Sequence, residues 1–112
     1  MILYHNPRCS KSRQCLAYLE AKKYPFTIVK YLDEELTAED LRAIIQKSGK
    51  RAFDFVRTQE KDYKEHYKDQ ELSDDEWIEV LVKNKRLLAR PIVINGDRAI
   101  HAVPPERVEE IL

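Results

Sequence analysis

The stretch Ile2-Leu3-Tyr4-His5-Asn6-Pro7-Arg8-Cys9-Ser10-Lys11-Ser12-Arg13 decides the fold of this chain. Its first three residues are apolar and predict a short buried strand, which Pro7 ends. From about Ser10 to Lys23 the apolar residues recur with helical spacing, so a helix is expected there. Cys9 therefore lies at a strand-to-helix junction.

The next elements complete a strand–helix–strand unit. Pro25 breaks the helix, and the residues from Phe26 to Val29 are aromatic and β-branched, which favours a strand. Two strands joined through a helix pair in parallel by a right-handed crossover.

Two further helices have clear start signals. Thr37 is a natural N-cap with Asp40 three residues later, and Gly49 suits the end of that helix. Ser73 and Glu76 repeat the capping pattern, and Trp77 is interpreted as a core residue.

The C-terminal part predicts a hairpin and a last helix. The residues from Pro91 to Ile94 form the first strand, Asn95-Gly96 the two-residue turn, and Arg98 to His101 the returning strand. Pro104-Pro105 starts a final helix, whose inward-facing residues are expected to be Val108, Ile111 and Leu112.

This order of elements predicts the fold class. It is an α/β thioredoxin-like sandwich (β-α-β … β-β-α), with an inserted helical subdomain from about Leu36 to Leu88. Residues 1–112 are expected to form one domain, and the insert separates the chain from a plain glutaredoxin.

Composition excludes several function classes. Twenty Lys and Arg balance twenty Asp and Glu, so the formal net charge of +0 provides no field for nucleic acid or an anionic membrane. No apolar run approaches the ~20 residues that span a bilayer. No signal segment is recognised, so a cytoplasmic location is expected. The chain is also expected to be a monomer.

Cys9 is the candidate nucleophile. No Asp or Glu precedes Glu20, and Arg8, Lys11 and Arg13 surround the sulfur in sequence. A thiol at a helix N-terminus among cations has a lowered pKa, and its thiolate is the reactive form. The alternative is an inert small residue in a turn.

The two cysteines do not suggest a metal site. A zinc ion needs four ligands, and adding His5 and His101 to Cys9 and Cys15 gives no familiar spacing. Reduced thiols are the norm in the cytoplasm, so catalysis or inert burial is favoured over a structural disulfide. No bound metal or cofactor is expected.

Two arginines are candidate oxyanion ligands. Arg90 directly precedes Pro91 at the mouth of an apolar strand, and Arg57 lies between helical patterns. A guanidinium suits a tetrahedral oxyanion because it offers paired N–H donors. The alternative is that both are surface arginines with packed stems.

Three segments together resemble a known family. His5-Asn6-Pro7-Arg8-Cys9-Ser10-Lys11-Ser12-Arg13, Val56-Arg57 and Arg90-Pro91-Ile92-Val93 are similar to the ArsC family of arsenate reductases. These enzymes are of the glutaredoxin-coupled, thioredoxin-fold type, and Spx regulators and YffB-like proteins are their relatives. The resemblance runs from Ile2 to Leu112.

The resemblance implies roles for individual residues. Cys9 matches the nucleophile that attacks arsenate, and His5 matches a histidine that helps to lower its pKa. Ser12 and Arg13 match the helix-start residues that support the thiolate. The residues that match the oxyanion arginines and the cis-proline facing the cysteine are Arg57, Arg90 and Pro91.

One position departs from the family pattern. The arsenate reductases carry a third arginine just before the Pro-x-Glu that opens the last helix, where this chain has Val103. Losing one oxyanion donor costs about 3–4 kcal/mol of transition-state stabilisation. Efficient arsenate reduction is therefore in question.

Cys15 has two interpretations. The Spx-type Cys-x-x-Cys switch is absent because Ser12 replaces the second cysteine. On one helix Cys15 would rise about 9 Å above Cys9, too far for a bridge without unwinding. Cys15 is therefore interpreted as a core residue, and the alternative is a resolving cysteine.

The expected function is a thiol oxidoreductase of the arsenate reductase type. A small oxyanion or glutathione is the expected ligand, and glutathione, glutaredoxin or thioredoxin the electron donor. The alternatives are an Spx-like regulator that binds RNA polymerase and a glutathione-dependent thiol reductase that does not act on arsenate.

Overall fold

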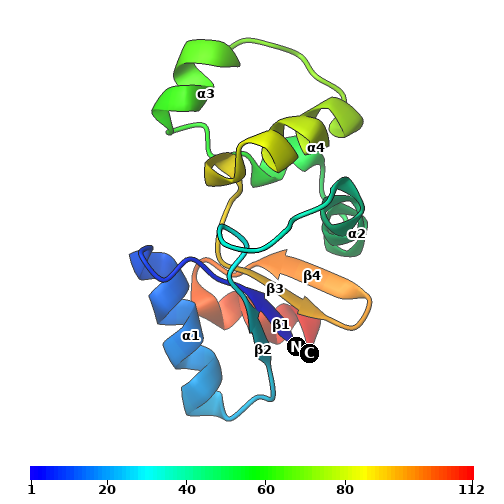
Figure 1. Ribbon diagram of the computed structural model, residues 1–112. Coiled ribbons are helices and arrows are strands. Elements are labelled where there is room, and N and C mark those ends of the chain that lie inside the picture. The colour runs from blue at the N-terminus through cyan, green and yellow to red at the C-terminus, as the bar shows by residue number, and fades with distance from the viewer. The chain divides into compact units, whose positions relative to one another are not determined.

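The computed structural model describes residues 1–112 (Figure 1). The chain divides into two compact units. The first unit combines Met1–Glu35 with Arg90–Leu112, and the second unit is Leu36–Ala89. No helix in the chain is both long and apolar enough to cross a lipid bilayer.

The first unit is built on one four-stranded sheet. Its strands are β1 (Ile2–Tyr4), β2 (Thr27–Val29), β3 (Ile92–Asn95) and β4 (Arg98–His101), in the order β2-β1-β3-β4. β1 is parallel to β2 and antiparallel to β3, which is antiparallel to β4. The predicted β-α-β … β-β-α order is confirmed, and the fold class is α/β thioredoxin-like.

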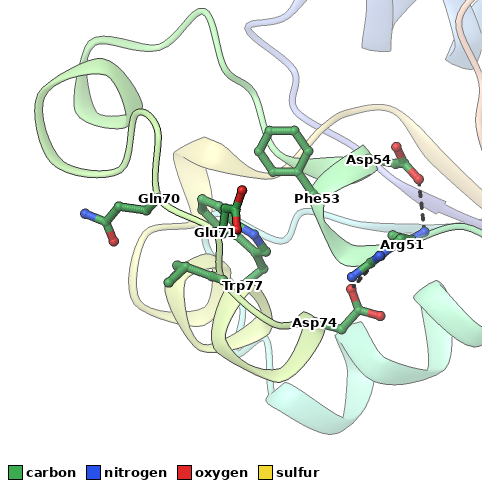
Figure 2. Close-up of a pocket in the computed structure, with 8 residues that line it drawn as sticks. Arg51, Phe53, Asp54, Gln70, Glu71, Asp74 and Trp77 are labelled. Atoms are coloured by element: carbon green, nitrogen blue, oxygen red, sulfur yellow. Dashed lines mark hydrogen bonds and ion pairs between the residues drawn. The ribbon is translucent and has the colours of Figure 1, made fainter.

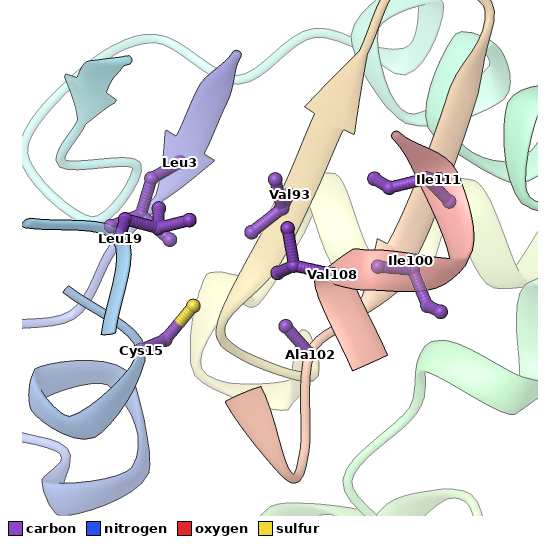
Figure 3. Packing of buried hydrophobic residues seen from close by; sticks show 8 residues of the cluster. All are labelled: Leu3, Cys15, Leu19, Val93, Ile100, Ala102, Val108 and Ile111. Atoms are coloured by element: carbon purple, nitrogen blue, oxygen red, sulfur yellow. The ribbon is translucent and has the colours of Figure 1, made fainter. Parts of the chain in front are cut away.

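Two helices pack against the sheet through one apolar cluster. They are α1 (Ser10–Lys22) and η3 (Pro105–Ile111), the latter a 3-10 helix. Figure 3 shows the cluster, which strands, α1 and η3 all supply. Its buried members are Leu3, Cys15, Leu19, Val93, Ile100, Ala102, Val108 and Ile111. This core fixes the start of α1 relative to β1 and β3.

The boundaries of α1 follow from its end residues. Cys9 is the N-cap, with extended backbone angles, and no side chain caps the helix there. Lys23 takes the left-handed conformation at the C-terminus, and its N–H bonds back to the helix. The first backbone N–H groups of α1 therefore have no side-chain cap.

The hairpin turn lies one residue later than predicted. Asn95 pairs with Arg98, so the two-residue loop is Gly96-Asp97 and not Asn95-Gly96. Gly96 alone has a positive φ, of 62°, and glycine first in the loop fits a type II′ turn. The Asn95 Nδ2 donates to the Ile111 carbonyl at 2.8 Å, which keeps Asn95 in the strand.

The last helix is confirmed in place but differs in type. The segment forms a 3-10 helix, which has about three residues per turn. Some side chains that an α-helix would place on the buried face therefore point elsewhere. Val108 and Ile111 are buried as expected, whereas Leu112 is 56% exposed. The predicted inward position of Leu112 is therefore wrong.

The second unit is helical. Its elements are α2 (Ala38–Ser48), η1 (Ala52–Phe55), α3 (Lys61–His66), α4 (Asp74–Lys83) and η2 (Lys85–Leu87). Both predicted capping boxes are present, Thr37 with Asp40 and Ser73 with Glu76. Gly49 ends α2 in the left-handed conformation with φ 69°.

An aromatic cluster joins three elements of the second unit. Trp77 is 2% exposed, and its ring lies 5.3 Å from the Phe53 ring. The Tyr63 and Tyr67 rings lie 6.2 and 6.0 Å from the same indole, so α3 contributes one aromatic edge. Such pairs add about 0.5–1.5 kcal/mol each beyond area burial. The core interpretation of Trp77 is confirmed.

Candidate functional site

The loop between β1 and α1 carries Cys9 on a tight turn. The Asn6 side-chain oxygen accepts from the Arg8 N–H at 3.0 Å, and the Asn6 carbonyl accepts from the Cys9 N–H, also at 3.0 Å. Asn6 is 6% exposed. An asparagine that bonds the backbone two residues on is a turn-former, so Asn6 sets the path of the chain into Cys9. Its place before Pro7 is the sequence signal for this role.

The environment of the Cys9 sulfur lowers its pKa. Burial opposes ionisation and is the largest single influence, but neighbouring N–H donors and a positive charge together outweigh it. The donors are the Ser12 and Lys11 backbone N–H groups and the Arg90 side chain, whose positive charge also contributes. The two N–H groups belong to the first turn of α1, where backbone N–H groups have no acceptor within the helix. The net result is a thiol whose pKa is lowered from its ordinary value.

His5 and Ser12 form a buried hydrogen-bond pair behind Cys9. The His5 Nδ1 and Ser12 Oγ atoms lie 2.6 Å apart, and the Ser12 Oγ also accepts from the Asn6 N–H at 3.0 Å. Because that hydroxyl still has its proton to donate, we assign His5 Nδ1 as the acceptor. Burial, then the positive charges of Lys30 and Arg13, lower the pKa of His5.

His5 is therefore a neutral imidazole near pH 7 and does not act on Cys9 as a cation. Its geometry connects it to Cys9 through Ser12. The Ser12 side chain is held by His5 while the Ser12 backbone N–H donates to the sulfur.

The three cations near Cys9 in sequence do not act directly on the sulfur. Arg13 Nη1 donates to the Pro7 carbonyl at 3.0 Å, so Arg13 braces the loop. The side chains of Arg8 and Lys11 are exposed, where water screens their charges. Lys11 contributes its backbone N–H instead. The expectation that all three charges crowd the sulfur is wrong, and Arg90 is the cation that contacts it.

Arg90 enters the site from the start of β3. The Arg90-Pro91 peptide bond is cis. The Pro91 carbonyl accepts from the Ala102 N–H at 3.0 Å, and His101 Nε2 lies 3.2 Å from the Arg90 carbonyl. The backbone of Arg90 is thus held by the end of β4. The role of His101 was missed from the sequence, although the hairpin register places it opposite Ile92.

Arg57 belongs to the second unit and is engaged there by a carboxylate. Its Nη2 lies 2.9 Å from Glu60 Oε1, and its Nε donates to the same oxygen at 3.1 Å. Both side chains are largely buried, at 21% and 34% exposed. The Arg57 N–H donates to the Leu87 carbonyl at 2.7 Å, which fixes the backbone. Sequence reasoning missed Glu60, although an Arg–Glu pair three apart is visible in the chain.

Cys15 lies in the apolar core of the first unit, where Figure 3 shows its sulfur among the cluster side chains. It is 0% exposed and free, and burial raises its pKa to about 11. Its thiol is therefore protonated and inaccessible in this conformation. The core interpretation agrees with this packing, whereas a resolving role would need local opening of α1.

Val103 stands where the resemblance implies a third arginine. Its N–H donates to the His101 carbonyl at 2.9 Å, and its side chain is half-buried and apolar. The neighbouring Arg98 is exposed and pairs in the hairpin with Asn95. Position 103 therefore supplies no N–H donor from a side chain.

The second unit has a surface hollow of about 450 Å³ that offers little chemistry (Figure 2). Phe53 and Trp77 form part of its wall, and two of its carboxylates already have partners. Asp54 accepts from the Arg51 N–H at 3.0 Å, and Asp74 accepts from the Ala52 N–H at 3.1 Å. No cysteine, serine or histidine lines it. No group of three or more His, Cys, Asp or Glu side chains in the chain is placed to hold a metal ion.

The structure thus brings together most of the predicted site. The Ser12 backbone N–H and the Arg90 side chain both act on the Cys9 sulfur, with His5 and Arg13 bracing the turn behind it. The functional roles assigned to these residues remain predictions, as does that of Arg57.

Comparisons of the sequence and of the structure with known proteins match this chain to the same family. The ArsC family model matches residues 4–111. The chain is 41% identical to "Arsenate reductase" of Haemophilus influenzae, over 100% of this chain and 98% of that protein. A solved structure, "Arsenate reductase from Vibrio cholerae", has 39% identity and a TM-score of 0.92, and the match covers 99% of this chain and 96% of that chain.

A more distant relative carries a different name. The chain is 30% identical to "Global transcriptional regulator Spx 1" of Lactococcus lactis, over 84% of this chain and 74% of that protein.

Proposed function

The chain belongs to the ArsC family, and from that premise we propose that it is a cytoplasmic, monomeric thiol oxidoreductase that reduces arsenate with Cys9 as its single nucleophile. One observation carries the proposal. The Ser12 and Lys11 backbone N–H groups and the Arg90 side chain lower the pKa of the Cys9 thiol, so the thiolate is favoured. The arsenate reductase names of the full-length relatives support the substrate.

The chemistry begins with attack of the Cys9 thiolate on the arsenic atom. An As–S bond forms and one arsenate oxygen leaves as water after protonation. The Arg90 guanidinium stabilises the developing negative charge on the remaining oxygens. The resemblance to the ArsC family implies the same role for Arg57.

A second thiol completes the reduction. Arsenate takes up two electrons to become arsenite, and Cys9 and one glutathione supply them by joining in a mixed disulfide. A glutaredoxin or thioredoxin then attacks this disulfide and returns Cys9 to the thiolate. His5 and Ser12 hold the first turn of α1 in place throughout.

The test is reduction of arsenate coupled to glutathione and glutaredoxin. We expect the wild-type protein to turn over and Cys9→Ser to be inactive, while Cys15→Ala retains activity because Cys15 is a core residue. Retention of full activity by Cys9→Ser would contradict the assignment. A glutathionylated peptide in the same coupled assay separates arsenate reduction from simple thiol reduction.

A regulatory function like that of Spx has less support. In this chain Ser12 stands where a second cysteine would close a redox switch, and its hydroxyl is fully buried between His5 and Asn6. Failure to bind purified RNA polymerase in a pull-down is the expected result.

A further inference from the structure

The peptide unit between Arg90 and Pro91 can only accept hydrogen bonds. Proline has no backbone N–H, so the Arg90 carbonyl is the one hydrogen-bonding group of this unit. His101 Nε2 lies 3.2 Å from that carbonyl. Because a carbonyl oxygen only accepts, we assign the proton to Nε2, which donates. A side chain of β4 therefore orients the peptide unit through which Arg90 enters β3.

The backbone around His101 is itself held in place. His101 is the last residue of β4 and pairs with the first residue of β3. Its carbonyl accepts from the Val103 N–H at 2.9 Å, and the Ala102 N–H donates to the Pro91 carbonyl at 3.0 Å. The imidazole thus extends from an ordered strand end and can transmit the position of that strand to Arg90.

The direction of the Arg90 side chain depends on its own carbonyl. The carbonyl carbon is bonded to the Arg90 Cα, so a fixed carbonyl fixes the direction in which the side chain leaves the backbone. An arginine side chain has a large rotamer entropy, so its charged end stays at one place only where its base is well held. The turn at Asn6 holds Cys9 separately, so Arg90 is the partner that has to be aimed.

We propose that His101 is a positioning residue: the hydrogen bond from its Nε2 to the Arg90 carbonyl aims the Arg90 side chain at Cys9. The inference rests on the proposed function, because that function has Arg90 stabilise the thiolate and the charge that develops on the oxyanion. It adds to the site a residue of β4 that acts through Arg90.

The experiment follows the reactivity of Cys9 without turnover. The full chain is alkylated with iodoacetamide over a range of pH, and Cys15 does not interfere because it is fully buried. His101→Leu removes the donor and keeps an apolar side chain, and His101→Val, which suits a strand, is a second variant without a donor. We expect the alkylation rate near pH 7 to fall about two- to fivefold in both, the effect of one lost hydrogen bond. The decrease should be smaller than that in Arg90→Met, because Arg90 is still present.

Three comparisons separate positioning from a general effect on the strand. His101→Gln is the rescue variant, because its amide N–H can donate to the same carbonyl, and it should keep the wild-type alkylation profile. Arg98→Ala removes an exposed side chain from the same strand and should also keep it. In an Arg90→Met background His101→Leu should have no further effect, since it acts through Arg90.

The outcomes distinguish this inference from the proposed function. If His101→Leu and His101→Val alkylate like wild type, or if His101→Gln is slowed as much as they are, the inference is overturned and the proposed function stands. A full effect of His101→Leu in the Arg90→Met background also overturns it. If Arg90→Met itself alkylates like wild type, both proposals lose their basis. If wild type does not reduce arsenate but the Leu variant is slowed and the Gln variant is not, the proposed function fails and the positioning role stands.

Discussion

Replacing Ser12 by alanine should destabilise the protein more than any surface serine. The Ser12 hydroxyl is fully buried and bonds both the Asn6 N–H at 3.0 Å and His5 Nδ1 at 2.6 Å. Alanine at position 12 leaves both partners buried without a hydrogen bond. Each orphaned group costs about 1–3 kcal/mol, so we expect a loss of about 2–6 kcal/mol in the free energy of unfolding.

Urea unfolding followed by far-UV circular dichroism measures this loss. With a slope of about 2 kcal/mol per molar urea, in the middle of the range for a small protein, the midpoint should fall by about 1–3 M. Ser10→Ala is the matched control, because Ser10 begins the same helix but is exposed. That variant should stay within about 0.5 kcal/mol of wild type. If Ser12→Ala matched Ser10→Ala, the hydroxyl would not be satisfying two buried groups and the reasoning would be refuted.

Three further outcomes are expected. Arg90→Met should raise the pKa of Cys9, because it removes a donor and a positive charge from the thiolate; the pH dependence of iodoacetamide alkylation measures this. In an alkaline absorbance titration Tyr18 should ionise near its pKa of about 12, because its hydroxyl donates to Glu109 at 2.7 Å, and Glu109→Gln should bring it down toward the ordinary value of 10.0. Cys15, with a pKa of about 11 and no exposure, should stay unlabelled by iodoacetamide at pH 8 until urea unfolds the chain.

Each of these three predictions would be contradicted by a specific result. Arg8 is exposed, so Arg8→Met should leave the pKa of Cys9 unchanged, and a shift equal to that of Arg90→Met would mean that general charge outweighs contact. An unchanged Tyr18 titration in Glu109→Gln would remove Glu109 as the cause. Labelling of Cys15 at the rate of Cys9 would show that α1 opens readily.

Local signals in the sequence were enough for most of the fold. The capping boxes at Thr37 and Ser73 were predicted because cap and partner are three residues apart and need no tertiary context. The hairpin was predicted from Gly96, but its register was not. Asn95 is kept in the strand by a hydrogen bond to Ile111, which no local rule describes.

The candidate site was harder to predict because closeness in sequence is not closeness in space. Arg8 and Lys11 adjoin Cys9 in the chain, yet their charges face water. The cation that acts on the sulfur is Arg90, which is far from Cys9 in the sequence. Glu60 lies three residues after Arg57 in the sequence, but that spacing alone did not indicate that the two side chains form an ion pair.

The division of the first unit into two chain segments has a consequence for biosynthesis. β1 lies between β2 and β3 in the sheet, and Leu3 is opposite Val93. As the polypeptide emerges from the ribosome, β1, α1 and β2 must wait for the entire second unit before their central ladder can close. Arg90, which helps to ionise Cys9, arrives on that same late segment. We therefore expect the nascent chain to carry an ordinary, weakly nucleophilic thiol until the last strands are made.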